Sequence, residues 1–431
     1  MNLITKSKFF LHALLLCVFI ISNIPASDVY LNMEGSSKRR LFISVQDFIK
    51  AGREIDGNTA NDLKKIIAND LRISNYFNVE EETTLMDYAA CEGSYEFMLT
   101  KNLDYIVTGQ IKFDKSISII VEVFDIVSKE KIMKEKWIVK DSVRASAHMI
   151  SDEIILRVTG NIGLNCTKIV FISDETGHKE VWSIDFDGQY SKKITDHKSL
   201  AILPRWHPSG TGIIYTCYKK KNPDLYYYDI NNNTSRILSY KQGLNTAAEY
   251  SPDGKRIALT LTIKGDPEVC LIDKKGFFQK QLTHSRGIDT SPTWAPSGRQ
   301  LAFISERTGV TQIYLADKDG WKAVPITFDP TFKDSPEWSP DGEEIVFSSR
   351  KDRKWDIFVV NVVTKEIRQL TRFEGNNENP SWSPDGTKIC FTSKVSGKAE
   401  LYIVDAKGGK KRKLGSFKGR VFTPKWSGYR T

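Results

Sequence analysis

A short sequence pattern recurs along the second half of this 431-residue chain every 44 residues. It is clearest at 338–342, which reads Trp-Ser-Pro-Asp-Gly. A fixed period of about 40–50 residues is typical of propellers and solenoids. The pattern therefore constrains the fold more than any other feature. The aromatic residues that begin its copies are Trp206, Tyr250, Trp294, Trp338, Trp382 and Trp426.

Each repeat predicts four short strands. The Asp-Gly step at 341–342 indicates a hairpin turn, because glycine adopts a positive φ without steric cost. After a first strand that ends at Trp338, apolar runs predict strands at 345–347, 356–360 and 367–370. No helical periodicity separates them, which disfavours a helical solenoid. Four short strands make one blade of a β-propeller.

The repeated aromatic residues and turns are expected to be structural. A large side chain at a constant register is expected to pack between neighbouring blades, and its truncation to alanine would cost about 3–5 kcal/mol. The Pro-Asp-Gly steps are interpreted as turn chemistry and not as catalytic carboxylates.

The number of blades follows from the first strands. Only five residues follow Trp426, so its strand lacks partners after it. Three predicted strands at 168–172, 180–184 and 191–195 lack a first strand before them. We therefore expect Val421–Trp426 to complete the blade that begins at Lys168. This arrangement closes a six-bladed ring and removes two exposed sheet edges.

The first 26 residues have the pattern of a secretory signal peptide. Lys6 and Lys8 precede an apolar run at 9–24, and Ala26 supplies the small residue before a cleavage site after Ala26 or Ser27. Cys17 lies inside the apolar run without a small residue before it, so lipidation is disfavoured. No other stretch is long enough to cross a bilayer. The sequence predicts export as a soluble protein.

A small α/β domain is expected at 27–160, before a propeller at 165–431. Alternating residues at 40–48 predict a strand, and helical spacing appears at 58–77 and 142–158, with a possible further helix at 84–99. Strands are predicted between them. A mixture of strands and helices in this order indicates an α/β fold.

Composition excludes some classes of protein. The formal net charge is +9, partly from a basic run at 407–413 that is interpreted as a solvated turn, with attraction to an anionic surface left open. No base-reading or stacking motif accompanies the charge, so nucleic-acid binding is disfavoured. Five cysteines remain after cleavage, without close pairs, and no disulfide framework is predicted.

The sequence contains no motif of a common active site. G-x-S-x-G, H-E-x-x-H, P-loop and G-x-G-x-x-G patterns are absent, and no peptidase domain fits after Trp426. We therefore expect neither enzymatic activity nor a cofactor. The leading alternative is an exported carbohydrate-binding or metal-dependent carbohydrate-active propeller.

The candidate binding residues lie on the innermost strands, just before the repeated aromatic residues. They line either a water-filled channel or a mouth that recognises a partner. Three of them, Asp289, Asp334 and Glu378, could attract a divalent cation, although side chains that alternate in direction disfavour a shared ion. The candidates are Thr246, Ala247, Asp289, Thr290, Ser291, Asp334, Ser335 and Glu378.

The leader, the α/β domain with its Asp-Tyr-Ile-Val-Thr-Gly run at 104–109, and six blades with the Trp-Ser-Pro-Asp-Gly repeat together resemble the TolB family, periplasmic components of the Tol-Pal system. The resemblance implies no catalysis. It implies that the propeller mouth binds the peptidoglycan-associated lipoprotein Pal, and that the mature N-terminal segment engages TolA of the inner membrane. Such proteins support outer-membrane integrity and constriction during cell division. The segment for TolA would be Asp28, Val29, Tyr30, Leu31, Asn32, Met33 and Glu34.

Two positions depart from the family pattern. Residues 200–203 are apolar where the other blades are polar, and Tyr250 replaces tryptophan. The first departure changes one side of the expected Pal-binding mouth.

Overall fold

The computed structural model describes residues 39–52, 57–80, 102–320, 322–372, 375–395 and 397–429. From Arg40 onward the chain forms one compact unit. The expected signal peptide, the segment 28–34 and the possible helix at 84–99 lie outside the described residues.

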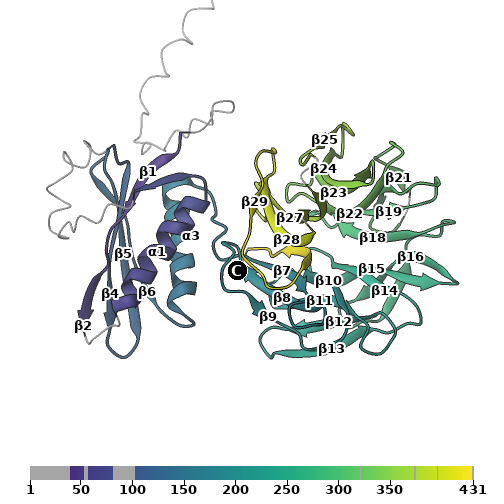
Figure 1. Ribbon diagram of the computed structural model, residues 1–431, viewed down its shortest axis with the longest axis horizontal. Coiled ribbons are helices and arrows are strands. Elements are labelled where there is room, and N and C mark those ends of the chain that lie inside the picture. Colours follow the sequence, from purple (N-terminus) through teal and green to yellow (C-terminus); the bar gives the residue numbers. More distant parts are fainter. Residues whose placement is uncertain are drawn as a thin grey trace, which may run out of the picture. The chain divides into compact units, whose positions relative to one another are not determined.

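Among the residues that the structure describes, a mixed β-sheet and two helices form the N-terminal part. The sheet order is β3-β1-β4-β5-β6, with β2 paired to β4. Strand β4 is parallel to β1, whereas β4, β5 and β6 are antiparallel neighbours. Figure 1 shows the two helices side by side. The elements are β1 (Leu41–Val45), β2 (Ile49–Gly52), α1 (Gly57–Ile73), β3 (Phe77–Glu80), β4 (Tyr105–Phe113), β5 (Ile117–Asp125), β6 (Glu130–Ile138) and α3 (Val143–Thr159).

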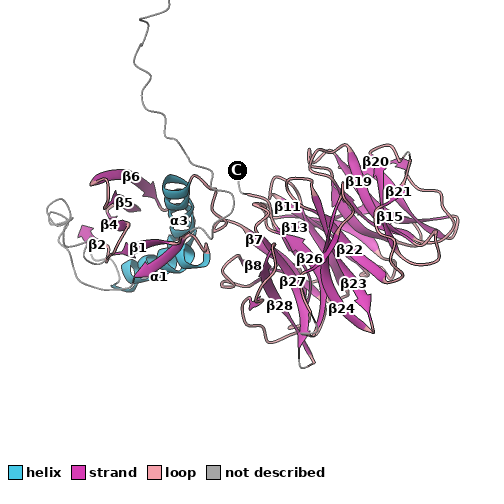
Figure 2. Ribbon diagram, turned by 90° about the horizontal axis from the view of Figure 1, so that it is seen from above, coloured by secondary structure: helices cyan, strands magenta, loops and turns pink. Residues whose placement is uncertain are grey.

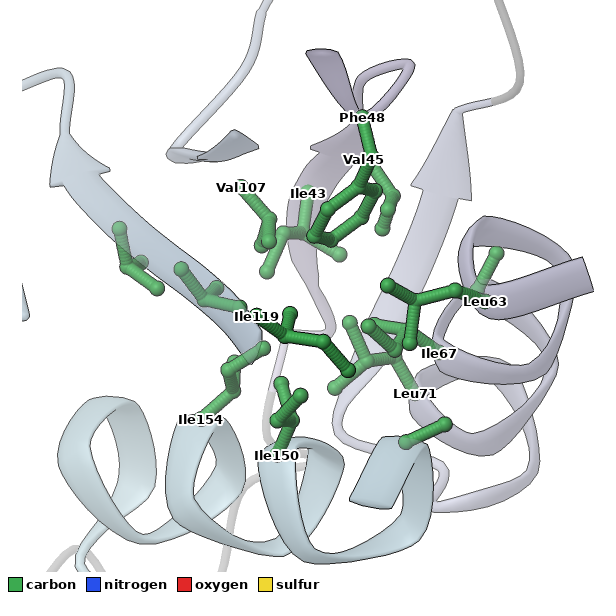
Figure 3. Packing of buried hydrophobic residues seen from close by; sticks show 14 of the residues in the cluster. Ile43, Val45, Phe48, Leu63, Ile67, Leu71, Val107, Ile119, Ile150 and Ile154 are labelled. Atoms are coloured by element: carbon green, nitrogen blue, oxygen red, sulfur yellow. The ribbon is translucent and has the colours of Figure 1, made fainter. Parts of the chain in front are cut away.

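Apolar residues from the sheet and from both helices form the main core of this part, and Ile106, Phe124 and Ile126 form a smaller second cluster. Leu63 and Ile67 of α1 and Ile150 of α3 are fully buried and point toward Ile119 of β5 (Figure 3). Helix α3 begins where the side chain of Ser142 accepts a hydrogen bond from a backbone N–H, and it ends at Gly160, whose φ of 73° only glycine adopts without strain.

The second part is a six-bladed β-propeller, as predicted, and each blade is a four-stranded antiparallel sheet. Figure 2 shows the strands of this part in magenta and their connecting loops in pink. Listed from the innermost strand outward, the blades are: blade 1, β30 (Val421–Trp426), β7 (Lys168–Ser173), β8 (Glu180–Asp185) and β9 (Lys192–Lys193); blade 2, β10 (Ala201–Trp206), β11 (Gly212–Cys217), β12 (Asp224–Asp229) and β13 (Thr234–Ser239); blade 3, β14 (Asn245–Tyr250), β15 (Arg256–Ile263), β16 (Asp266–Asp273) and β17 (Phe278–Gln281); blade 4, β18 (Asp289–Trp294), β19 (Gln300–Ser305), β20 (Gln312–Asp317) and β21 (Val324–Pro325); blade 5, β22 (Phe332–Trp338), β23 (Glu344–Lys351), β24 (Lys354–Asn361) and β25 (Ile367–Gln369); blade 6, β26 (Asn376–Trp382), β27 (Lys388–Val395), β28 (Lys398–Asp405) and β29 (Arg412–Lys413).

The C-terminal strand closes the ring as expected. Strand β30 pairs with β7, with Val421 opposite Ser173 and Trp426 opposite Ile169. The indole Nε1 of Trp426 donates a hydrogen bond to Oγ1 of Thr167 at 2.9 Å. Residues about 250 positions apart along the chain therefore share one blade, and the prediction of closure is confirmed.

The repeated aromatic residues lie between neighbouring blades. Trp382 is buried, and its Nε1 donates to the carbonyl oxygen of Glu337 in the preceding blade at 3.2 Å. The turn after Trp338 is held by the hydroxyl of Ser339, which donates to Asp341, and by the positive φ of Gly342. These contacts have the structural character expected of the repeat.

A second polar repeat fixes the loops that lead to the mouth. Thr283 donates to the carboxylate of Glu268 at 2.5 Å and accepts from the N–H of Val269. In the next blade, Thr327 makes the same contact with Gln312. Each pair joins the end of an outermost strand to the start of the third strand, which restrains the loop that enters the next innermost strand.

Candidate functional site

All six innermost strands contain a β-bulge at the same register. The pairing register shifts in each strand, and the residue at the shift has a left-handed φ between 45° and 56°. Proline follows in five of the six strands, and its missing N–H interrupts the ladder at this point. A bulge redirects the side chains around it. The six bulge residues are Leu203, Ala247, Ser291, Ser335, Asn379 and Thr423.

The bulge residues converge on the axis of the propeller. They line a cavity of about 30 Å³, together with neighbouring prolines and the side chains of Arg205 and Lys425. Ser335 donates to the side-chain oxygen of Asn379 in the next blade at 3.0 Å. The channel therefore narrows at the level of the bulges.

Two residues after the bulges along the innermost strands, a ring of paired charges spans the channel. Arg205 of blade 2 contacts Glu337 of blade 5 at 2.6 Å, and these blades face each other across a six-membered ring. Lys425 of blade 1 contacts the same carboxylate at 2.7 Å, and Arg205 also contacts Glu249 at 3.1 Å. We call Arg205, Glu249, Glu337 and Lys425 the charge ring.

Hydrogen bonds from neighbouring blades complete the charge ring. Glu337 accepts from the hydroxyl of Ser381 at 2.7 Å and from the N–H of Trp382 at 2.8 Å. Burial alone would raise the pKa of Glu337, but the positive charges of Lys425 and Arg205 outweigh it and lower that pKa. Burial lowers the pKa of Lys425, opposed by the charge of Glu337. The ring links opposite blades and makes the channel floor rigid.

The charge ring was not anticipated from the sequence, although a signal for it exists. Its members lie two residues after each bulge and directly before the repeated aromatic residue, at the same 44-residue spacing. Charged residues at one register of an innermost strand must face one another around the axis. Comparing the residue directly before the aromatic residue in each repeat would have identified these charges from the sequence.

Three of the eight predicted mouth residues, Ala247, Ser291 and Ser335, border the narrow cavity above the charge ring. Thr246 and Thr290 each precede one of these residues in the sequence and are half-buried, and Thr290 lines a second, larger cleft. Asp289 is different because it has no exposed surface. Its carboxylate accepts from Ser285 and pairs with Arg307 at 3.0 Å, so it supports a loop and does not face the mouth.

Two carboxylates on adjacent blades give the mouth its acidic character. Asp334 is exposed and Glu378 is half-buried. Burial together with the charge of Asp334 raises the pKa of Glu378. The two acids repel each other, so a partner that donates hydrogen bonds or brings positive charge to them would relieve this repulsion.

A cleft of about 340 Å³ opens beside Asp334, between blades 4 and 5. Its apolar wall includes Ile288, Ile304 and Phe332, and its polar wall includes Glu306. Arg350 stacks on the rings of Phe332 and Trp355, with 4.6 and 5.7 Å to the ring centroids. Such a cleft can receive a side chain from a docked partner.

The apolar segment at 200–203 reaches the mouth at two positions. Leu200 is exposed and Leu203 borders the narrow cavity, whereas Ala201 is buried. This side of the mouth therefore offers apolar contact where the other blades offer polar groups.

One cluster of potential metal ligands occurs among the described residues. Donor atoms of Asp70, His148 and Asp187 lie within 4.8 Å of one another. Arg144, however, donates two hydrogen bonds to Asp187 and pairs with Asp185 at 2.8 Å. The cluster already has cations, which disfavours a metal.

The protonation of His148 agrees with an ion network. His148 Nδ1 lies 2.7 Å from Asp70. Burial opposes the charged imidazole, but hydrogen bonds to Asp185 and Asp70 outweigh it and raise the pKa of His148 to about 9. A protonated imidazole cannot ligate a metal. The residues Asp289, Asp334 and Glu378 do not form a ligand group within the described part of the chain either.

Comparison with family models identifies both parts of the chain. Residues 156–430 match the model described as "TolB beta propeller domain", and residues 29–132 match the "TolB amino-terminal domain". The chain belongs to the TolB family. The resemblance expected from the repeat is thereby confirmed.

Individual relatives agree with this assignment. A protein of Rickettsia akari named "Tol-Pal system protein TolB" is 31% identical over 179 residues, which are 39% of this chain and 40% of the relative. The protein of Desulfosudis oleivorans with the same name is 29% identical over 230 residues, which are 51% and 52% of the two chains. These alignments thus span about half of each relative or less.

A solved structure matches over more of the chain. The crystal structure of TolB from Acinetobacter baumannii has a TM-score of 0.79 and 25% identity, and the match covers 91% of this chain and 97% of that one. Within the described residues, no helix is long and apolar enough to cross a membrane.

Proposed function

We propose that this protein is a component of the Tol-Pal envelope system and acts as a non-enzymatic scaffold that binds Pal at the propeller mouth. Family membership and the names of its relatives support this role. The observation that carries the proposal is the charge ring, whose contacts join opposite blades across the channel. A mouth with a fixed floor offers a preorganised docking surface, which lowers the cost of binding a folded partner.

The proposed docking surface consists of the mouth residues that the structure leaves accessible. Asp334 and Glu378 form its acidic centre, and the cleft beside Phe332 provides an apolar anchor point. Asp289 contributes indirectly by holding Arg307. The remaining contact residues are Thr246, Ala247, Thr290, Ser291 and Ser335.

We further propose that the segment 28–34 engages TolA after signal-peptide cleavage in the periplasm, so that the protein connects Pal to the inner membrane and supports outer-membrane integrity and constriction during division. If docking of Pal changes the availability of this segment, TolA must change the affinity for Pal by the same factor. Measuring the affinity for TolA with and without Pal tests this coupling, and identical values would refute it.

Titration calorimetry with the soluble domain of Pal tests the main proposal. Replacing both Asp334 and Glu378 with alanine should weaken binding at least tenfold, because central contacts contribute most of the binding energy. The control is Glu343→Ala with Glu366→Ala, two exposed acids at the other end of blade 5. Equal affinity for all three proteins, or retention of a glycan in place of Pal from an envelope extract, would contradict the proposal.

A further inference from the structure

Two turns of the propeller carry dense positive charge. The turn between β11 and β12 contains Lys219, Lys220 and Lys221. The hairpin of β23 and β24 carries Lys351 at the end of β23 and Arg353 in its turn, with a single acid, Asp352. All of these side chains are exposed. Within the described part of the chain, none of the five cations has a carboxylate at ion-pair distance. We call these two turns the basic tips.

The strand order places both basic tips on the face that contains the mouth. Ala201, the first residue of innermost strand β10, pairs with Cys217, which ends β11 just before the first tip. Phe332, the first residue of β22, pairs with Arg350 just before the second tip. Blades 2 and 5 occupy opposite positions of the ring (Figure 1). The basic tips therefore flank the mouth on two sides.

The second tip extends farther than the corresponding turn of blade 4, and its ladder is as long as those of blades 3 and 6. The β23–β24 ladder has eight residue pairs, whereas the β19–β20 ladder of blade 4 has six. At about 3.3 Å per residue, two further pairs lengthen this hairpin by roughly 7 Å. Asp352 and Arg353 both have positive φ, as in a tight two-residue turn. The charges of Lys351 and Arg353 are thus held away from the blade.

The positive charge of the first tip affects the pKa of a histidine that packs against blade 2. Burial lowers the pKa of His197, and the charge of Lys219 adds to this lowering. No acid occurs among residues 218–223. The tip therefore projects an uncompensated positive field, in a chain whose formal net charge is +9.

We propose that the basic tips bind the phosphate-bearing headgroups of an anionic lipid bilayer. A small anion cannot contact tips on both sides of the mouth, whereas a continuous negative surface meets both at once. Lysines and arginines close to anionic headgroups each add to membrane attraction. The acids Asp334 and Glu378 are on innermost strands and so lie nearer the axis than the tips.

Sedimentation of the purified protein with lipid vesicles tests this proposal without any protein partner, so its outcome is separate from that of the Pal experiment. We expect binding to vesicles of phosphatidylglycerol and phosphatidylcholine, little binding to phosphatidylcholine alone, and release by salt. Changing the three lysines of the first tip to glutamine should lower the partition coefficient roughly 100-fold, and Lys351→Gln with Arg353→Gln roughly 30-fold.

The matched control is Lys255→Gln, Lys274→Gln and Lys275→Gln, three exposed lysines in turns at the other end of blade 3. This control makes the same change in net charge and should retain most of the binding. Equal loss in the control would show attraction by overall charge only and overturn the proposal. Unchanged vesicle binding by the tip variants, with a salt-dependent loss of affinity for the Pal domain, would assign the tips to an acidic protein surface and also overturn it.

Discussion

The carboxylate of Glu337 is the position at which a single change should most weaken the propeller. It contacts Arg205 at 2.6 Å and Lys425 at 2.7 Å and accepts two hydrogen bonds from blade 6. Its side chain is 14% exposed and that of Lys425 is 7% exposed. Glu337→Gln keeps the size of the side chain and removes the charge that both cations share.

The magnitude follows from the two ion pairs. At an effective dielectric constant of about 20, each contact at this distance has a gross attraction of about 6 kcal/mol. Desolvation of the partners offsets much of this attraction, and removing one partner of a buried pair costs about 3–5 kcal/mol because the other charge remains buried. After the change, Arg205 retains Glu249, whereas Lys425 loses its direct carboxylate contact. We therefore expect the free energy of unfolding to fall by about 3–5 kcal/mol.

Urea unfolding followed by tryptophan fluorescence measures this change. The signal reports mainly on the propeller, because only Trp137 of the nine tryptophans lies before residue 165. Glu343→Gln, an exposed acid in the next turn, is the control and should cost less than about 0.5 kcal/mol. A loss below about 1 kcal/mol for Glu337→Gln would refute the reasoning. The double variant Glu337→Met with Lys425→Met should be less destabilised than Glu337→Gln, since it leaves fewer unpaired charges.

Three other changes test the remaining packing and pH effects. Burial raises the pKa of Glu268 to about 7, so the contribution of this side chain to stability is lost as the pH rises through 7. Glu268→Gln introduces the residue that Gln312 provides in the next blade, and it should raise the free energy of unfolding above about pH 7 by on the order of 1 kcal/mol. Urea unfolding at acidic pH and above about pH 7 measures this effect, and no gain is expected at acidic pH. The pKa of His148 is raised to about 9, so the stabilisation by its charged ring is present below pH 6.5 and is lost as the pH rises through 9. His148→Gln should therefore lower the free energy of unfolding by about 2 kcal/mol near pH 6 and by little above pH 9. A loss that is independent of pH in the same assay would contradict the ion network. Trp426→Ala should cost about 3–5 kcal/mol and expose the junction of β30 and β7 to limited proteolysis, whereas protection equal to that of the unchanged protein would argue against closure by this residue.

The blades could be predicted because their signals are local. Asp-Gly steps and short apolar runs specify hairpins within a few residues, and the constant spacing after Trp206 specifies how many hairpins there are. Closure by Val421–Trp426 could be predicted for a related reason. A strand without partners at one end and three strands without an innermost member at the other leave a single arrangement that satisfies both sheet edges.

The candidate site could be predicted only in part. The innermost strands were placed correctly, but a bulge in each strand changes the direction of the side chains around it. As a result, Ser291 and Ser335 line the channel, whereas Asp289 turns into the blade and pairs with Arg307. The regular alternation of side chains along a strand, which the sequence pattern indicates, does not predict this change of direction.

By itself, the sequence determined the number of blades, their strand order and the closure of the ring, because turn residues and strand patterns act over short distances along the chain. Only the tertiary structure decided which charges meet in the channel. Arg205 and Glu337 are 132 residues apart and come into contact because closure of the ring places blades 2 and 5 opposite each other. Ion pairs across the propeller axis form only when the complete ring brings opposite blades together, so the sequence of a single blade does not predict them.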